Sequence, residues 1–292
     1  MGSPAFHSYT KGSAINIEDR LGVCSWSLLP DDGAALVEQV RRLGLPKLQL
    51  ALDPIREDPG RWADLEDRLA DAGIQLVSGQ FGAVGEDYSS PQTIRATGGV
   101  VPDATWPANR ENLEASLGLA ERFGLTVLST HAGFIPPDPG DAVFGRLVER
   151  VRHLADRIAD RLDGRLLLET GQETAETLER FLTAIDRDRV GVNFDPANLL
   201  LYAMGDPVTA LRRLLPRLGQ FHVKDATPPT EPGQWGAELP VGEGAVDWAA
   251  VLSTLSEAGY DGDLIIEREA GQQRAQDIAV ARDRIKAAWP GD

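Results

Sequence analysis

Cysteine is nearly absent from this chain: Cys24 is the only one among 292 residues. A single thiol cannot form an intrachain disulfide, and disulfides are typical of oxidising compartments. We therefore expect a cytoplasmic protein. The first twenty residues contain no apolar stretch of the kind found in a signal peptide, and we expect residues 1–20 to form a loose tail.

Long apolar runs and positive charge are also scarce. The longest apolar runs, such as the one from Leu199 to Met204, are far shorter than the roughly 20 residues that a membrane span requires. The 29 Lys and Arg residues are outnumbered by 45 Asp and Glu residues, so the formal net charge is −16. Because a protein that binds along phosphates needs a basic face, we expect neither nucleic acid nor a membrane as a partner.

What the chain does have is a regular alternation of short apolar runs and segments with helical spacing. Leu113, Leu117 and Ala120, for example, fall on one face of a helix. Several segments end at a glycine directly before the next apolar run, as expected where a residue after a helix needs positive φ. The candidate strands cover residues 21–25, 47–52, 74–78, 125–131, 165–170, 190–195, 218–224 and 263–269. This alternation predicts an α/β fold, a (β/α)₈ TIM barrel that forms one domain over residues 21–292.

Two connections are too long to be simple turns, residues 79–107 and residues 226–244. Long loops in a compact domain commonly act as lids or binding loops. Both follow predicted strands, so both are expected on the catalytic face of the barrel. The alternative is that either loop is an insertion unrelated to substrate.

Acidic and imidazole side chains end four successive predicted strands: Glu169, Asp195, His222 and Glu267. Strand ends of a barrel converge on one face, and converging carboxylates repel unless a positive charge lies between them. Three oxygen ligands and one nitrogen ligand favour one divalent metal ion, Mn²⁺ or Mg²⁺, with Co²⁺, Ni²⁺ and Zn²⁺ as alternatives. The other interpretation is four separate charges, each paired with a Lys or Arg.

Five short motifs resemble those of the xylose isomerase-like TIM barrel superfamily, also called the sugar phosphate isomerase/epimerase family. They are Leu168-Glu169-Thr170-Gly171, Asn193-Phe194-Asp195-Pro196-Ala197-Asn198, His222-Val223-Lys224-Asp225, Gly242-Glu243-Gly244 and Ile266-Glu267-Arg268-Glu269. The resemblance implies that Glu169, Asp195, His222 and Glu267 bind one divalent metal. It also implies that Glu169 and Glu267 are the catalytic residues that carry protons.

Such a site favours proton transfer next to a carbonyl, through an enediolate that the metal stabilises. We therefore expect a metal-dependent isomerase or epimerase with a small-molecule sugar as its substrate. A homo-oligomer is left open. Predicted substrate-binding residues, each with an ordinary structural role as the alternative, are His131, Lys224, Asn198, Glu173, Arg274, Trp26 and Gln80. For Lys224 the alternative is an ion pair with Asp225 or Glu243.

Three other functions compete with this one. A metal-dependent lyase, hydrolase or deglycosidase acting on 3-keto sugars or glycosides would share the first proton abstraction. An apurinic endonuclease of the same superfamily would use many histidines, whereas this chain has four. Of these, His7 and His153 fall in the tail and a helix, and Asn198 stands where that branch is expected to carry a histidine. A non-catalytic barrel would lack a ligand, and none of the four is missing.

Overall fold

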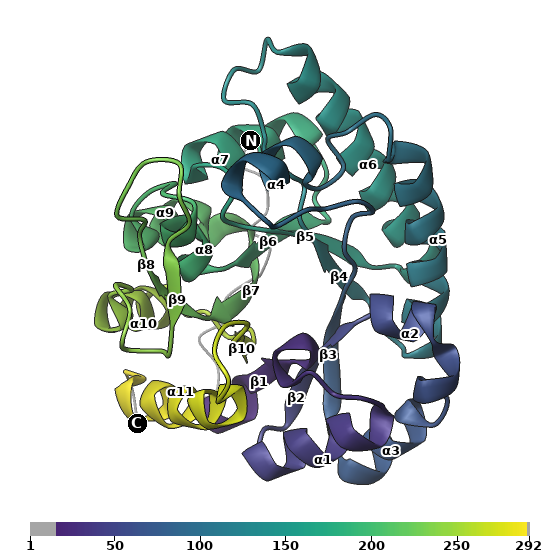
Figure 1. Ribbon diagram of the computed structural model, residues 1–292, viewed down its shortest axis with the longest axis vertical. Helices are drawn as coiled ribbons and strands as arrows, with labels where there is room; N and C mark the ends of the chain where they lie inside the picture. Colours follow the sequence, from purple (N-terminus) through teal and green to yellow (C-terminus); the bar gives the residue numbers. More distant parts are fainter. Residues whose placement is uncertain (1–15, 291–292) are drawn as a thin grey trace.

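Eight parallel strands close into a barrel in the computed structural model, which describes residues 16–290 (Figure 1). This confirms the predicted single-domain TIM barrel. Around the barrel the strands follow the order β1, β10, β7, β6, β5, β4, β3 and β2. Their bounds are β1 Leu21–Cys24, β2 Lys47–Ala51, β3 Gln75–Gln80, β4 Val127–Thr130, β5 Arg165–Glu169, β6 Val190–Phe194, β7 Leu218–Val223 and β10 Leu264–Ile266.

The predicted strands agree with these bounds, and the largest difference is at the last one. The range 263–269 shrinks to β10, because after Glu267 donates its backbone N–H to Val223 the chain leaves the barrel. β5 and β10 are apolar and buried along their middle residues, which is typical of parallel strands covered on both faces.

A ring of helices surrounds the barrel, and each helix packs an apolar face against the strands. Leu113, Leu117 and Ala120 are fully buried, as the helical spacing predicted. Gly44, which ends the first helix, has φ of +63°, the left-handed conformation that glycine adopts without a steric penalty. The outer helices are α1 Gly33–Leu43, α3 Leu65–Ala72, α5 Trp106–Arg122, α6 Ala142–Leu162, α7 Ala175–Ile185, α9 Pro207–Leu214, α10 Trp248–Glu257 and α11 Arg274–Ala288.

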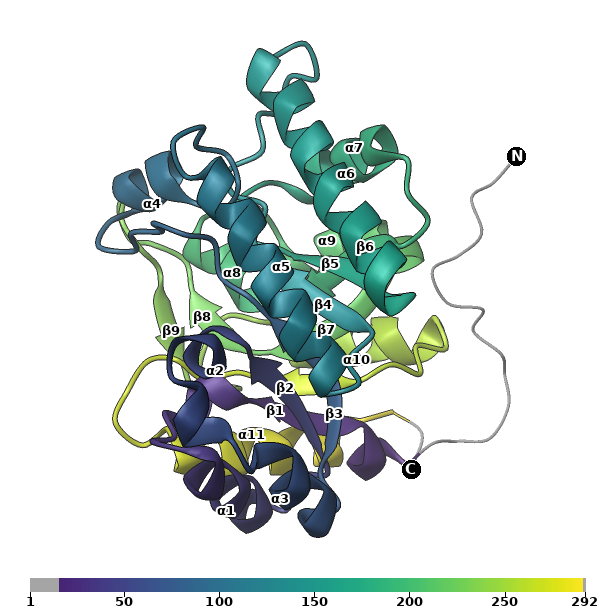
Figure 2. The same ribbon diagram turned by 90° about the vertical axis from the view of Figure 1, so that its right-hand side faces the viewer.

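Both long connections contain secondary structure that the sequence analysis had not predicted. Residues 79–107 include α4 Pro91–Thr97, which Ser90 and Thr93 start with a capping box. The connection after β7 holds an antiparallel pair of strands, β8 Asp225–Thr227 and β9 Ala237–Leu239. The two insertions lie at the same end of the barrel in Figure 2, and Gln92 donates a hydrogen bond to the Gly233 carbonyl across them (3.1 Å).

Short helices complete the fold, namely α2 Asp53–Glu57, α8 Pro196–Leu201, η1 Ile17–Arg20, η2 Ser25–Leu28, η3 Pro59–Trp62 and η4 Leu215–Arg217. Of these, η1 corrects the predicted tail. Ile17 is buried in the core, and the Arg20 guanidinium lies 4.6 Å from the centre of the Trp289 ring. The last residues of the predicted tail therefore belong to the barrel, while residues 1–15, His7 among them, lie outside the described part of the chain.

Within residues 16–290, no helix combines the length and the hydropathy needed to span a membrane.

Candidate active site

The barrel brings the four predicted metal ligands to one place. Glu169 ends β5, His222 lies in β7, and Asp195 and Glu267 directly follow β6 and β10. These strands are consecutive neighbours in the barrel. One ligand atom from each side chain lies within 4.8 Å of the others, and all four residues are buried.

The short helix α8 orients Asp195. This residue is the N-cap of α8, and its Oδ1 accepts hydrogen bonds from the backbone N–H groups of Ala197 (2.8 Å) and Asn198 (3.1 Å). Pro196 suits the first helical position, where no backbone donor is needed. Because Oδ1 is used by the cap, Oδ2 is left for the centre of the cluster.

Three buried atoms of the cluster find no hydrogen-bond partner among the described residues: Asp195 Oδ2, His222 Nδ1 and Glu267 Oε2. His222 Nδ1 lies 3.1 Å from Glu267 Oε2 and 3.3 Å from Glu169 Oε1. Buried polar atoms are costly to leave unpaired, and burial raises the pKa of Asp195 well above its usual range. A divalent cation bound to these oxygen and nitrogen atoms would relieve both costs, so the residues present fit a metal ion.

Lys224 stands beside the cluster and supplies positive charge. Its Nζ lies 3.2 Å from Glu267 Oε2 and 3.8 Å from Asp195 Oδ2, and it donates to Glu269 Oε2 (2.6 Å). Burial opposes the charge of the ammonium, but Glu267, Glu269 and Asp195 together raise the pKa of Lys224. The alternative ion pairs considered for Lys224, with Asp225 or Glu243, do not form: Asp225 binds backbone N–H groups and Glu243 lies near Arg284.

Glu169 is held by three of the predicted substrate-binding residues. Gln80 donates to Oε2 (3.0 Å), Asn198 donates to Oε1 (3.1 Å), and His131 Nε2 lies 3.5 Å from Oε2. Gly171, which has φ of +139°, makes the Asn198 contact feasible, since a Cβ there would lie 2.4 Å from Asn198 Cβ. These side chains therefore orient a carboxylate as well as facing the cavity.

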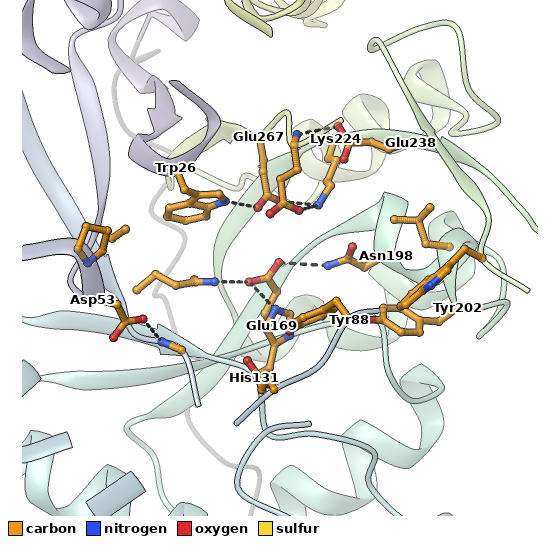
Figure 3. Close-up of a pocket in the computed structure, with 18 residues that line it drawn as sticks. Trp26, Asp53, Tyr88, His131, Glu169, Asn198, Tyr202, Lys224, Glu238 and Glu267 are labelled. Carbon is orange, nitrogen blue, oxygen red and sulfur yellow. Dashed lines mark hydrogen bonds and ion pairs between the residues drawn. The ribbon is translucent and has the colours of Figure 1, made fainter. Parts of the chain in front are cut away.

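Trp26 performs a similar task for the other glutamate. Its indole Nε1 donates to Glu267 Oε1 over 2.7 Å. Glu267 and Glu169 approach the centre of the site from different sides, the first with Trp26 and Lys224, the second with His131 and Asn198 (Figure 3).

A cavity of about 550 Å³ opens above the cluster. Nine of the eleven predicted site residues line this cavity or lie directly beneath it. The cavity lining also contains residues that were not predicted from the sequence, and many of them belong to the two insertions. These added residues include Asp53, Glu86, Tyr88, Tyr202, Trp235, Glu238 and Glu269. The length of the insertions was the available signal, but it did not indicate which of their side chains face the cavity.

Glu173 and Arg274, both predicted to bind substrate, are not part of this cavity lining. Glu173 is buried, and burial raises its pKa to about 8. Arg274 begins α11 and lines a separate surface hollow with Ser27 and Gln39. Both residues lie beyond the predicted strands: Glu173 shortly precedes α7 and Arg274 begins α11, and the strand pattern does not determine the path of the chain between a strand and its helix.

Known proteins were compared with this chain by sequence and by fold. A xylose isomerase domain protein from Planctomyces limnophilus has 30% identity and a TM-score of 0.83, covering 92% of this chain and 96% of that structure. An inosose dehydratase from Lacticaseibacillus casei is 27% identical over 124 residues, which are 38% of this chain and 41% of the relative. An L-ribulose-5-phosphate 3-epimerase from Salmonella paratyphi C is 41% identical over 68 residues, 23% of this chain and 22% of the relative.

The chain thus matches less than half the length of either curated relative. The family model described as "xylose isomerase-like TIM barrel" matches much more, residues 33–288. This range includes the four clustered side chains and nearly all of the barrel. The chain therefore belongs to the xylose isomerase-like TIM barrel family.

Proposed function

We propose that this protein is a divalent-metal-dependent sugar isomerase or epimerase that transfers a proton next to a carbonyl group. The observation that carries the proposal is the pair of buried glutamates. Glu169 and Glu267 each place one oxygen close to the same atom, His222 Nδ1, at 3.3 Å and 3.1 Å. A substrate carbon between them could lose its proton to one carboxylate, while the other glutamate, protonated from solvent, delivers a proton to the opposite face.

Glu169, Asp195, His222 and Glu267 would hold the metal. When bound, a divalent cation polarises the substrate carbonyl as a Lewis acid and so eases removal of the neighbouring proton. Mg²⁺ and Mn²⁺ suit a donor set rich in carboxylate oxygens. Co²⁺, Ni²⁺ and Zn²⁺ are the alternatives, and elemental analysis of the purified protein would identify the bound metal.

Neighbouring groups favour the proton-accepting form of both glutamates. Burial works against ionisation of Glu267, but the Lys224 ammonium, 3.2 Å from Oε2, opposes it, and the pKa of Glu267 lies well below its usual value. Glu169 accepts hydrogen bonds from the side chains of Gln80 and Asn198, which favour a carboxylate. Two bases on different sides of one carbon suit an epimerase, since each would serve one of the two epimers.

A dehydratase is the second candidate, and the tyrosines of the cavity favour it. Tyr88 and Tyr202 both line the cavity, and a tyrosine hydroxyl, with an ordinary pKa of about 10, keeps its proton at neutral pH. After a glutamate takes the proton beside the ketone, the hydroxyl on the next carbon could leave with a tyrosine proton as water, and a C=C bond would form. The partial likeness to inosose dehydratases agrees with this alternative.

The cavity also suggests an uncharged substrate. Beyond Glu169 and Glu267, whose charge a bound divalent cation would offset, its lining contains the carboxylates of Asp53, Glu86, Glu238 and Glu269, against the ammonium of Lys224. A sugar phosphate or sugar acid would be repelled by this lining.

A cytoplasmic location and a homo-oligomeric state stay predictions.

The proposal is tested by proton NMR in D₂O, with Mg²⁺ and a panel of ketoses and cyclic polyol ketones. We expect deuterium to enter a carbon next to the carbonyl, and we expect chelation to stop the exchange. A product one water lighter would identify the dehydratase. Metal binding without exchange or elimination in any compound would contradict the proposed chemistry.

Glu169→Gln and Glu267→Gln form a matched pair for assigning the bases. Each change keeps an oxygen ligand and removes one proton carrier, so each variant should retain metal and lose turnover by about 100-fold or more. For an epimerase, one variant should still exchange the proton of one epimer and the other variant that of the opposite epimer. Normal turnover in either variant would contradict the assigned roles.

A further inference from the structure

A chain of polar side chains crosses the barrel interior below the site. Interiors of such barrels are filled mainly by branched apolar side chains, yet Gln49 on β2 and Ser129 on β4 are polar and fully buried. Their strands flank β3, which carries Gln80 (Figure 1). Polar residues at such positions need partners, and here the partners connect His222 to Glu169.

Four hydrogen bonds join these residues in sequence. His222 Nε2 lies 2.7 Å from Gln49 Oε1. Gln49 Nε2 donates to Ser129 Oγ (2.9 Å), and Ser129 Oγ donates to Gln80 Oε1. Gln80 Nε2 donates to Glu169 Oε2 (3.0 Å). Every member between the two ends therefore both donates and accepts. Gln49 Nε2 also lies 3.4 Å from Gln80 Oε1, a longer second contact that runs in the same direction.

The direction of this chain follows from its last member. A carboxylate only accepts hydrogen bonds, so Gln80 must turn its NH₂ to Glu169 and its oxygen to Ser129. The Ser129 hydroxyl must then donate to Gln80 and accept from the NH₂ of Gln49. Gln49 is left with its oxygen facing His222 Nε2, which must carry the proton.

We propose that Gln49, Ser129 and Gln80 are positioning residues that fix the tautomer of His222 and the orientation of Glu169 together. With the proton on Nε2, the lone pair of His222 is on Nδ1, the atom that faces the carboxylates. The same chain holds Glu169 by Oε2 and leaves Oε1 toward the cluster. The inference rests on the proposed function for the role of these atoms as metal ligands.

One neighbour of His222 agrees with this arrangement, and a second agrees once its side-chain amide is turned over. The Cys24 thiol lies 3.6 Å from Gln49 Oε1, where it donates to an oxygen. The Asn193 amide lies 2.9 Å from His222 Nε2, and its Oδ1 has no partner within the described residues. Turning that amide over, which exchanges its nitrogen and oxygen, lets Oδ1 share the Nε2 proton.

Ser129→Ala removes the two shorter hydrogen bonds at the centre of the chain and leaves only the 3.4 Å contact of Gln49 with Gln80. Ser78→Ala is its matched control. Ser78 is equally buried inside the barrel and donates to Gln220 (2.9 Å), away from the site. We expect Ser129→Ala to weaken Mg²⁺ binding and turnover about 10- to 100-fold, and Ser78→Ala to leave both unchanged. Equal affinities in the two variants would overturn the proposal.

The tautomer itself can be observed by ¹⁵N NMR of histidine-labelled, Mg²⁺-loaded protein, which has four histidines to resolve. In the wild type the His222 proton should sit on Nε2 and exchange slowly with water; in Ser129→Ala it should exchange faster. A proton on Nδ1 in the wild type would overturn the proposal, while Nε2 protonation in an inactive protein would contradict only the proposed function.

Gln49→Glu tests the donor-to-acceptor direction of the hydrogen bonds between His222 and Glu169. The new carboxylate would accept from both His222 and Ser129, so the Ser129 hydroxyl would turn away from Gln80. Gln80 would then present its oxygen to Glu169. We expect Mg²⁺ affinity to be kept and kcat to fall about tenfold or more, the usual scale when a partner that orients a metal ligand is changed. A wild-type kcat in this variant would refute the proposed direction of the hydrogen bonds.

Gln49→Leu adds no buried charge and is the companion variant. It should lose Mg²⁺ affinity and kcat together, and retention of both would refute the proposal as well.

Discussion

At the scale of single residues, Glu173 gives the clearest dependence on pH. Its folded-state pKa is about 8, against an ordinary value of 4.5, because the carboxyl group is buried. Between these values the unfolded chain releases the proton and the folded chain keeps it, so the native state loses stability as pH rises. The loss amounts to about 1.4 kcal/mol per pH unit within that window.

Glu173→Gln removes this titration with little change of shape. We expect the variant to be more stable than the wild type at pH 8 by several kcal/mol, and almost equally stable at pH 5. Urea unfolding at both pH values measures the difference. Glu176→Gln, an exposed position on α7 with the same change of charge, is the control. A Glu173→Gln variant with no pH-dependent advantage would contradict the buried acid.

Sequence reasoning predicted single residues well where their position in a strand determined their surroundings. Glu169, Asp195, His222 and Glu267 lie at equivalent strand ends, and the structure brings their ligand atoms within 4.8 Å. Gln49 was overlooked because an inward-facing glutamine in a short apolar strand gives no local signal of its partner. That partner, Ser129, is distant in sequence and comes near only when the barrel closes.

At the scale of elements, Asp225 fixes the connection that carries β8 and β9. Its Oδ2 accepts from Gly242 N (2.7 Å) and Trp248 Nε1 (2.9 Å), and its Oδ1 accepts from Val246 N (3.1 Å). Gly244 passes so close to this carboxylate that a Cβ would lie 2.1 Å from Asp225 Oδ1. These contacts give the 242–244 turn a role in shaping the connection.

Gly244→Ala should therefore displace this connection, and with it the cavity residue Glu238 on β9. We expect a loss of about 1–3 kcal/mol in the free energy of unfolding, the usual cost of overpacking, and a higher KM. Thermal unfolding and steady-state kinetics measure the two effects.

Gly118→Ala provides the control for that change. Gly118 lies within α5 with no atom near its Cβ direction, and alanine favours helix by about 1 kcal/mol over glycine. This variant should be slightly more stable, with unchanged KM. If Gly244→Ala were as stable as Gly118→Ala, the contact between the turn and Asp225 would not constrain the connection.

The elements of the barrel could be predicted from sequence, whereas those of the insertions could not. Apolar runs and helical spacing locate β1 to β7 and β10, because burial on the barrel imposes a period. β8 and β9 have three residues each, as β10 does, but their sequences, Asp225-Ala226-Thr227 and Ala237-Glu238-Leu239, lack the apolar run of Leu264-Ile265-Ile266. Their pairing depends on Asp225 and on contacts with Arg268 and Glu269, which Glu238 binds from β9.

At the scale of the whole molecule, charge would select among substrates that share the proposed carbonyl chemistry. The formal net charge is −16, and the cavity lining carries more carboxylates than cationic groups. A negative field of this kind repels anions over about 10 Å at 0.1 M salt and is screened at higher ionic strength. The match to an L-ribulose-5-phosphate 3-epimerase covers 23% of the chain. A match this short gives no reason to expect a phosphorylated substrate here.

A ketose and its phosphate ester therefore form a decisive pair. We expect kcat/KM to be at least about tenfold higher for the uncharged ketose at low salt, because about 1.4 kcal/mol of repulsion gives that factor. The ratio should shrink as salt is added, since screening weakens only the repulsion. Kinetics with L-ribulose and its 5-phosphate at two salt concentrations measure this. A preference for the phosphate that weakens with salt would mean that a cation outside this cavity lining binds the ester, and would contradict the uncharged substrate class.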